Sequence, residues 1–190
     1  MYQALLADVR FHELLLAFDQ DLASAACARG CGLCGGALHS ARFPRKPRGG
    51  LAGLVEACDQ RFSFCCAEDG CRTRETPPSL RFLGRKVYLG AVVVMVETMR
   101  QGPTAARVRQ LTDLLGASRR TLARWREWWR SAFVASRFWK STSAAFMPPV
   151  DQGRLPVSLL ERFAGDAGAK LVALLRLLGP ITGGTAMHAV

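Results

Sequence analysis

The sequence predicts an α+β fold that is mainly helical and carries one small β-ribbon module. Apolar residues recur at three- and four-residue spacing before residue 26 and again after residue 87, which indicates amphipathic helices. All seven cysteines lie between residues 27 and 71, among turn residues and short alternating runs that indicate strands. The chain has 190 residues, of which 49% are hydrophobic, so we expect one globular domain or two small ones.

The first half of the chain divides into a helix and a cysteine-rich module. Residues 1–26 predict an N-terminal amphipathic helix. Its apolar positions are Leu5, Leu6, Val9, Leu14, Leu15 and Phe18, and acidic residues lie between them. Residues 27–86 form the cysteine-rich module. The alternating runs that predict its strands are 37–43, 61–66 and 80–84.

The second half of the chain predicts a helical domain and a less regular end. Residues 87–140 form the helical domain, with helices expected from residue 88 onward. The last segment, 141–190, begins with a predicted linker over 141–153 and continues as a helix. Glycines at 165 and 168 weaken or split that helix.

Four of the cysteines have the spacing of a metal site. Cys31 and Cys34 form a C-x2-C pair followed by two glycines, and Cys66 and Cys71 form a C-x4-C pair with a glycine before the second cysteine. Glycine permits the tight turns that let two thiolates converge on one ion. The pattern predicts a zinc ribbon, and four thiolates leave no open position for water, so the Zn²⁺ is expected to be structural.

The other cysteines leave two alternatives open. Cys65 competes with Cys66, since neighbouring strand residues face opposite sides and only one of them can face the ion. Cys27 lies four positions before Cys31 and is a substitute ligand without a turn of its own. Cys58 is expected to be a small buried hydrophobe.

Disulfide and redox interpretations of the same cysteines are less favoured. Seven is an odd number, and the N-terminus has no basic leader, so we expect a cytoplasmic location where thiols stay reduced. A redox C-x-x-C motif opens a helix after a strand, whereas glycines follow this one. No membrane association is expected, because the longest apolar run, 87–96, is about half of the ~20 residues that a bilayer helix needs.

The positive charge of the chain is confined to one segment. The whole chain has 26 Lys and Arg against 15 Asp and Glu, a formal net charge of +11. Residues 72–140 contain fifteen of the basic and four of the acidic residues, a difference of +11. Thirteen of those fifteen are arginine, the side chain that makes bidentate contacts with phosphate and guanine. This segment is therefore expected to bind nucleic acid.

Within this segment, residues 104–130 have the pattern of a helix-turn-helix. The apolar frame Leu111, Leu115, Ala117, Leu122 and Trp125 surrounds Gly116 at the turn. Ser118 is expected to cap the second helix, and Arg119, Arg120 and Arg124 to meet bases or phosphates. Arg107 and Arg109 are expected at the DNA backbone. The predicted nucleic-acid contacts are Arg107, Arg109, Ser118, Arg119, Arg120, Arg124 and Arg126.

Residues 27–150 resemble zinc-ribbon plus helix-turn-helix proteins of bacterial insertion sequences, including the N-terminal DNA-binding regions of some transposases. The resemblance is carried by RKPRGG (45–50), RFSFCC (61–66), CRTRETPPSLRFLGRKVYLGAVVV (71–94) and SRRTLARWREWWR (118–130). It implies double-stranded DNA as partner, together with a transposase or a second copy of this chain. A transposase also needs three metal-binding carboxylates, and the three acids after residue 130 lie in a linker and a short helix. The resemblance therefore implies the DNA-binding part without the catalytic domain.

The sequence thus predicts a non-enzymatic protein that binds DNA by sequence or by structure and is associated with a mobile element. A zinc-ribbon transcriptional regulator and an RNA- or protein-interaction module are the alternatives. A thiol oxidoreductase or a degenerate transposase represents the enzyme class.

Overall fold

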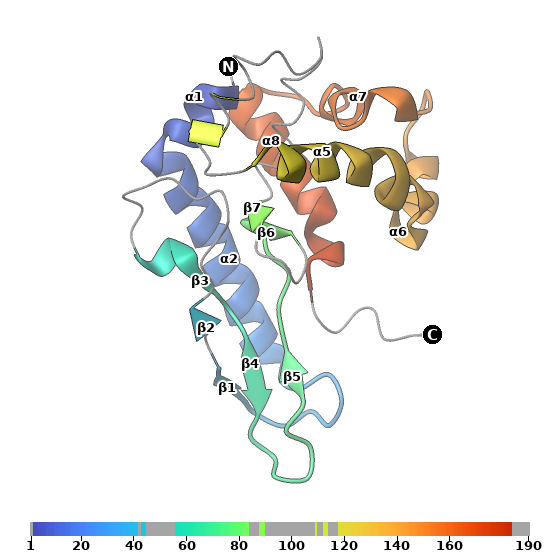
Figure 1. The fold of residues 1–190 in the computed structure, drawn as a ribbon. Helices are drawn as coiled ribbons and strands as arrows, with labels where there is room; N and C mark the ends of the chain where they lie inside the picture. Colours follow the sequence, from blue (N-terminus) through green and yellow to red (C-terminus); the bar gives the residue numbers. More distant parts are fainter. Residues whose placement is uncertain are drawn as a thin grey trace.

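The computed structural model describes residues 2–41, 43–44, 56–83, 88–89, 109, 112–113 and 118–183 (Figure 1). The described chain is mainly helical with a small antiparallel sheet, as the sequence predicts. In the predicted helix-turn-helix, both the first of the two helices and the turn lie outside the described residues. Isolated helical positions at 109 and 112–113 are the exception.

The helices include one long element at the N-terminus and a group near the C-terminus. They are α1 (Tyr2–Ala7), α2 (Val9–Arg29), α5 (Arg119–Trp128), α6 (Arg137–Thr142), α7 (Val157–Leu160) and α8 (Ala167–Leu178). Short 3-10 turns cover Glu56–Asp59, Ser143–Ala145, Gln152–Arg154 and Gly179–Ile181, and α5 continues into a π-helical turn, Trp129–Phe133. None of the helices in the described part of the chain has the length and apolarity needed to cross a membrane.

The structure differs from the predicted N-terminal helix, 1–26, in two ways, one at each end of α2. Asp8 interrupts it with an extended backbone, and its carboxylate accepts a hydrogen bond from the Arg10 N–H, which starts α2 as a capped helix. The helix then continues to Arg29, beyond the predicted boundary. It ends at Gly30, whose φ of +80° is accessible to glycine at little cost.

The strands are short and antiparallel. The main sheet has the order β1-β4-β5, formed by Leu38–Ser40, Phe64–Cys66 and Arg74–Glu75. Two further pairs join β2 (Phe43–Pro44) to β3 (Gln60–Arg61), and β6 (Phe82–Leu83) to β7 (Tyr88–Leu89). The prediction of helix from residue 88 is wrong at its start, because Tyr88 and Leu89 pair with β6. The sequence analysis also missed β5, which has only two residues and no alternating pattern.

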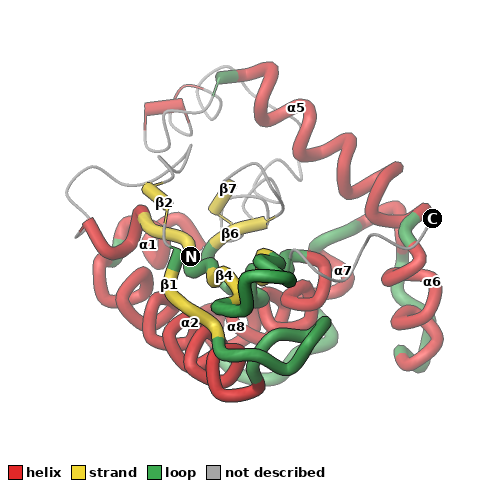
Figure 2. The backbone as a smooth tube through the Cα atoms, turned by 90° about the horizontal axis from the view of Figure 1, so that it is seen from below, coloured by secondary structure: helices red, strands yellow, loops and turns green. Residues whose placement is uncertain are grey.

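One hydrophobic core contains residues from all four predicted segments. Figure 2 shows α2 and α8 side by side below the rest, and the Arg176 guanidinium of α8 lies 4.4 Å from the ring centre of Phe18 on α2. The aromatic part of the core comes from α5 and the residues that follow it. The fully buried core side chains of largest volume include Trp129, Trp139, Phe82, Phe133, Leu15, Leu159 and Leu171.

The segment 141–153 was predicted to be a linker, but it packs against this core. Phe146 stacks on Trp139 with ring centres 6.2 Å apart, and Val150 is buried. The Arg162 guanidinium donates to the carbonyls of Pro148 and Pro149 at 2.7 and 2.9 Å. The Pro-rich composition of segment 141–153 thus indicates a non-helical connection, and the packing of its apolar residues holds the segment in place. The C-terminal helix is split as predicted, at Gly165 with φ of +97°.

A buried ion pair joins α2 to the strand region. Asp19 and Arg81 both have side chains that are 2% exposed, and the Arg81 Nε donates to Asp19 Oδ2 at 2.8 Å. Asp19 also accepts from the Leu80 N–H at 2.6 Å and from the Ser79 hydroxyl. Because both carboxylate oxygens are bonded, the charge is compensated in a place that water does not reach.

The other two nitrogens of the Arg81 guanidinium form hydrogen bonds to the backbone of a neighbouring turn. Its terminal nitrogens donate to the carbonyls of Ala57, Cys58 and Gln60 at 3.1, 2.9 and 2.9 Å. Arg81 belongs to the basic segment 72–140 that is expected to bind nucleic acid, but its own charge lies inside the molecule, where Asp19 neutralises it.

Asp19→Ala should lower the free energy of unfolding by about 3–5 kcal/mol, because it leaves the buried Arg81 guanidinium without its counter-ion. Denaturant unfolding followed by circular dichroism measures this change. The matched control is Asp21→Ala, an exposed acid on the same helix, which should change stability by about 0.5 kcal/mol or less. Similar losses from both variants would show that the buried pair is not a main source of stability.

Candidate metal centre

The sulfur atoms of Cys31, Cys34, Cys66 and Cys71 form one cluster, in which all four lie within 4.8 Å of one another. The Sγ atoms of Cys31 and Cys71 are 3.8 Å apart, and those of Cys34 and Cys66 are 3.4 Å apart. A disulfide needs about 2.05 Å, so these contacts are not disulfides. Four sulfurs at about 2.3 Å from a central ion form a tetrahedron with edges of about 3.8 Å. The cluster therefore has the size of a four-thiolate metal site.

The first pair of cysteines follows directly on α2 in a closed loop. The Cys31 N–H donates to the Gly36 carbonyl at 2.8 Å, and the Gly35 N–H donates to the Cys31 carbonyl at 2.8 Å. Gly30 and Gly35 have φ of +80° and +74°, a conformation that glycine adopts without a steric penalty. This backbone turns both sulfurs of the C-x2-C pair to the same side.

Gly36 lets the two cysteine loops approach each other. A Cβ at this position would lie 2.6 Å from Glu68 Cγ and 3.3 Å from the sulfurs of both Cys34 and Cys66. The Gly36 N–H also donates to the Cys34 sulfur. The sequence analysis assigned this glycine to the turn, and the structure adds that a side chain here would press on two of the four ligand sulfurs.

The second pair of cysteines lies at the end of the β4–β5 hairpin. The N–H groups of Cys71 and Arg72 both donate to the Glu68 carbonyl, at 2.9 and 3.0 Å, which closes a tight turn. Cys66 is the last residue of β4, and its N–H donates to the Thr73 carbonyl at 2.9 Å. The turn brings Cys71 back beside Cys66 and completes the cluster.

The two cysteines that were alternative ligands, Cys65 and Cys27, lie outside the cluster. Cys66 is fully buried in the cluster, whereas the Cys65 thiol points the other way and donates to the Arg72 carbonyl at 3.6 Å. The Cys27 thiol donates to the Leu38 carbonyl at 3.7 Å and is not in the cluster. Cys58 is buried as expected, and burial raises the pKa of its thiol.

The thiols of the cluster cannot all ionise easily without a cation. The Thr73 hydroxyl hydrogen bond lowers the pKa of Cys71 to about 6. The Glu68 N–H lowers the pKa of Cys66, but burial and the neighbouring thiols outweigh it and raise that pKa to about 12. The Cys71 thiolate thus forms readily, whereas Cys66 resists ionisation because it is buried and hydrogen-bonded to the neighbouring thiols. A divalent cation at the centre would favour the thiolate form of such a buried thiol.

A buried carboxylate supports the first cysteine loop from outside. Glu75 on β5 is 5% exposed, and its Oε2 accepts from the Gly32 N–H at 3.1 Å. Its Oε1 pairs with the Arg29 guanidinium at 2.8 Å. Glu75 therefore connects the end of α2, the C-x2-C loop and the sheet. Sequence reasoning missed it, because Glu75 lies 43 or more residues from both partners and matches no motif.

The predicted nucleic-acid residues that are described lie on or near α5. Ser118 caps this helix, as predicted, and its side chain accepts from the Thr121 N–H at 3.3 Å. Arg119, Arg120 and Arg124 are exposed, and Arg126 is half-buried. Arg109 is exposed at an isolated helical position, and Arg107 lies outside the described residues.

The face of α5 opposite the arginines is anchored in the core. Trp125 and Trp129 are 4% and 1% exposed, and Trp129 packs edge-on against Trp128 at 4.8 Å between ring centres. Leu111, Leu115 and Ala117 of the predicted apolar frame lie outside the described residues. The pairing of α5 with a preceding helix therefore stays a prediction. Figures 1 and 2 show that α5 and the cysteine loops lie at separate ends of the molecule.

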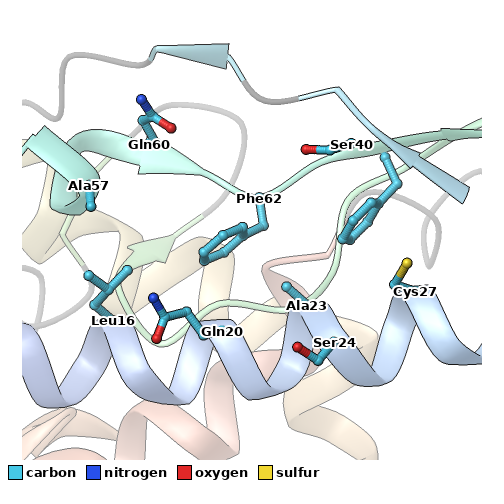
Figure 3. A pocket seen from close by; sticks show the side chains of 10 residues that line it. Leu16, Gln20, Ala23, Ser24, Cys27, Ser40, Ala57, Gln60 and Phe62 are labelled. Atoms are coloured by element: carbon cyan, nitrogen blue, oxygen red, sulfur yellow. The ribbon is translucent and has the colours of Figure 1, made fainter.

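A separate cavity of about 310 Å³ lies between α2 and the strands. Figure 3 shows Leu16, Gln20 and Ala23 on the helix side and Phe62 on the strand side, with Cys27 at one end. The described lining is mostly apolar, and none of the described residues that line it is charged.

Glu75→Ala should weaken metal binding about 10–100-fold, because it removes the group that fixes the C-x2-C loop without touching a sulfur. Competition between the protein and a chromogenic chelator for Co²⁺ or Zn²⁺ measures this affinity. Glu68→Ala removes an exposed carboxylate close to the same cluster and should have little effect. Equal losses from the two variants would assign the effect to local charge and not to the support of the loop.

Comparison with family models, with curated proteins and with solved structures gives no match to this chain, so the interpretation of the site rests on its own residues.

Proposed function

We propose that Cys31, Cys34, Cys66 and Cys71 bind one structural Zn²⁺. The separation of the sulfurs supports this, since it suits a tetrahedral ion with metal–sulfur bonds of about 2.3 Å. Iron also accepts four thiolates, so the identity of the metal is part of the test. Bound zinc would hold the two cysteine loops together and contribute to the folding of a module with little apolar core.

Purified protein should contain one zinc per chain, as measured by elemental analysis, and should lack the visible absorption of an iron–thiolate centre. Cys66→Ser should abolish this stoichiometry, because it removes a ligand. Cys65→Ser is the matched control, one residue away on the same strand, and should keep the zinc. Retention of zinc by Cys66→Ser would contradict the ligand assignment, and iron in place of zinc would contradict the choice of metal.

We propose that the chain is a DNA-binding protein and that α5 makes the main contact. The observation that carries this proposal is the two-sided character of α5. Its Trp125 is buried in the core, while Arg119, Arg120 and Arg124 are exposed on a helix that Ser118 caps. A helix about 10–12 Å across fits the major groove, which is about 12 Å wide.

Three arginines outside α5 each form an ion pair within the protein, which makes them weaker candidates for the contact with DNA. Arg81 is neutralised by Asp19 in the interior, and Arg72 pairs with Asp69 at the tip of the hairpin. Arg29 pairs with Glu75. Arg119 and Arg120 on α5 form no such ion pair with another described residue. Their exposed charge favours an anionic partner.

Binding to duplex DNA should fall about 10³–10⁵-fold between 50 and 200 mM salt, if about 6–10 phosphates are contacted. Arg120→Ala should weaken binding and reduce the slope of log affinity against log salt by about one phosphate contact. Arg154→Ala is the matched control, since Arg154 is exposed and pairs with Glu161 away from α5. A flat salt response, or equal effects of both substitutions, would contradict the proposal. Fluorescence anisotropy with labelled duplexes provides the measurement.

The same anisotropy titrations, repeated with single-stranded RNA, distinguish DNA binding from RNA binding. A single-stranded RNA reader would favour unpaired bases and exposed aromatic side chains, whereas the tryptophans of α5 are largely covered. We place the protein with a mobile element, as the DNA-binding part without catalytic activity. A zinc-ribbon transcriptional regulator is the alternative, and a palindromic binding site would favour it together with a dimer.

A further inference from the structure

The arginines of α5 are not spread evenly over its outer surface. Thr121, Trp125 and Trp129 are buried and follow one another at four-residue spacing, so they define the inner line of the helix. Residues two positions away are rotated by about 200°, at 100° per residue. Ala123 and Glu127 therefore form the outermost strip, and both are exposed.

The arginines lie in two rows on either side of this strip. Arg119 and Arg126 are seven residues apart and share one flank. Arg120 and Arg124 are four residues apart and share the other flank. Two contacts support this placement, because Arg126 is half-buried and the Arg124 Nη2 donates to the buried Thr121 hydroxyl at 3.4 Å. Arg124 and Arg126 thus lean toward the body of the protein, whereas Arg119 and Arg120 are exposed.

The carboxylate of Glu127 is the unexpected feature of this surface. Among the described side chains, no ion pair joins Glu127 to an arginine. A carboxylate that faced the DNA backbone would be repelled by phosphate. At the bottom of the major groove it meets base edges instead, and there a glutamate accepts a hydrogen bond from the N4 amino group of cytosine.

We infer that Glu127 determines base specificity, with the two arginine rows holding the phosphates on the two sides of the major groove. This inference rests on the proposed DNA binding. In this orientation the Glu127 carboxylate selects cytosine, and the methyl group of Ala123, one turn earlier, contacts a thymine methyl. The two arginine rows contribute affinity that does not depend on the DNA sequence, and the strip of Ala123 and Glu127 determines the base preference.

Selection of bound sequences from random duplex DNA by the zinc-loaded full chain tests the inference. The wild type should select cytosine at one position by about tenfold or more over other bases. Glu127→Gln should exchange this cytosine for adenine, because glutamine pairs with the N6 and N7 of adenine. Glu127→Ala should relax the choice of base at that position and raise non-specific affinity, since it removes a repelled charge.

Two control variants make the outcomes distinguishable. Glu161→Gln changes an exposed glutamate away from α5 and should keep the wild-type motif. Arg120→Ala should lower the affinity for all sequences alike and also keep the motif. An unchanged motif with Glu127→Gln, or a wild type without sequence preference, would overturn the inference while leaving DNA binding intact. Absence of salt-dependent binding by the wild type would overturn the proposed function itself, and the inference with it.

Discussion

The contact between Asp19 and Arg81 is the constraint on which the arrangement of the molecule depends. One stripe of α2 faces inward over its whole length, with Phe11 and Leu15 in the large helical core and Ala23 and Ala26 in the small cluster of the cysteine module. Asp19 lies between these two apolar regions and binds the guanidinium that also fixes the turn at residues 57–60. A buried pair of charges has one low-energy geometry, whereas apolar contacts tolerate sliding, so this pair sets the register of α2 against the strands.

The cysteine cluster depends on the same helix. α2 ends at Gly30, and Cys31 follows at once, so the orientation of the helix determines where the C-x2-C loop begins. Glu75 then fixes this loop to β5. The small cluster around the centre contains few large side chains and two of the ligand sulfurs, Cys31 and Cys66. The module therefore has little apolar surface to bury, and an ion would replace part of the missing core. Among the described residues, the large helical core and this cluster have no member in common, although α2 contributes to both.

The features that could be predicted from the sequence are local ones. The cysteine spacing, the Ser118 cap and the break at Gly165 each depend on neighbouring residues, and a short window of sequence contains them. The missed features all require contacts between distant residues. Nothing near Asp19 indicates a buried charge, and nothing near Glu75 indicates a support for a loop 43 residues earlier. The segment 141–153 has the composition of a linker, but its packing against Trp139 depends on the tertiary fold.

These long-range pairs also change what the net charge means. The count of basic residues treats every arginine alike, yet Arg29, Arg72 and Arg81 each have an acidic partner in the cysteine module and its connections. Their fields are largely cancelled within a few ångströms, so they attract a distant polyanion weakly. On α5 the arginines flank a single carboxylate and face solvent. Among the described residues, α5 therefore carries a group of exposed arginines on one helix, whereas Arg29, Arg72 and Arg81 are each paired with an acid.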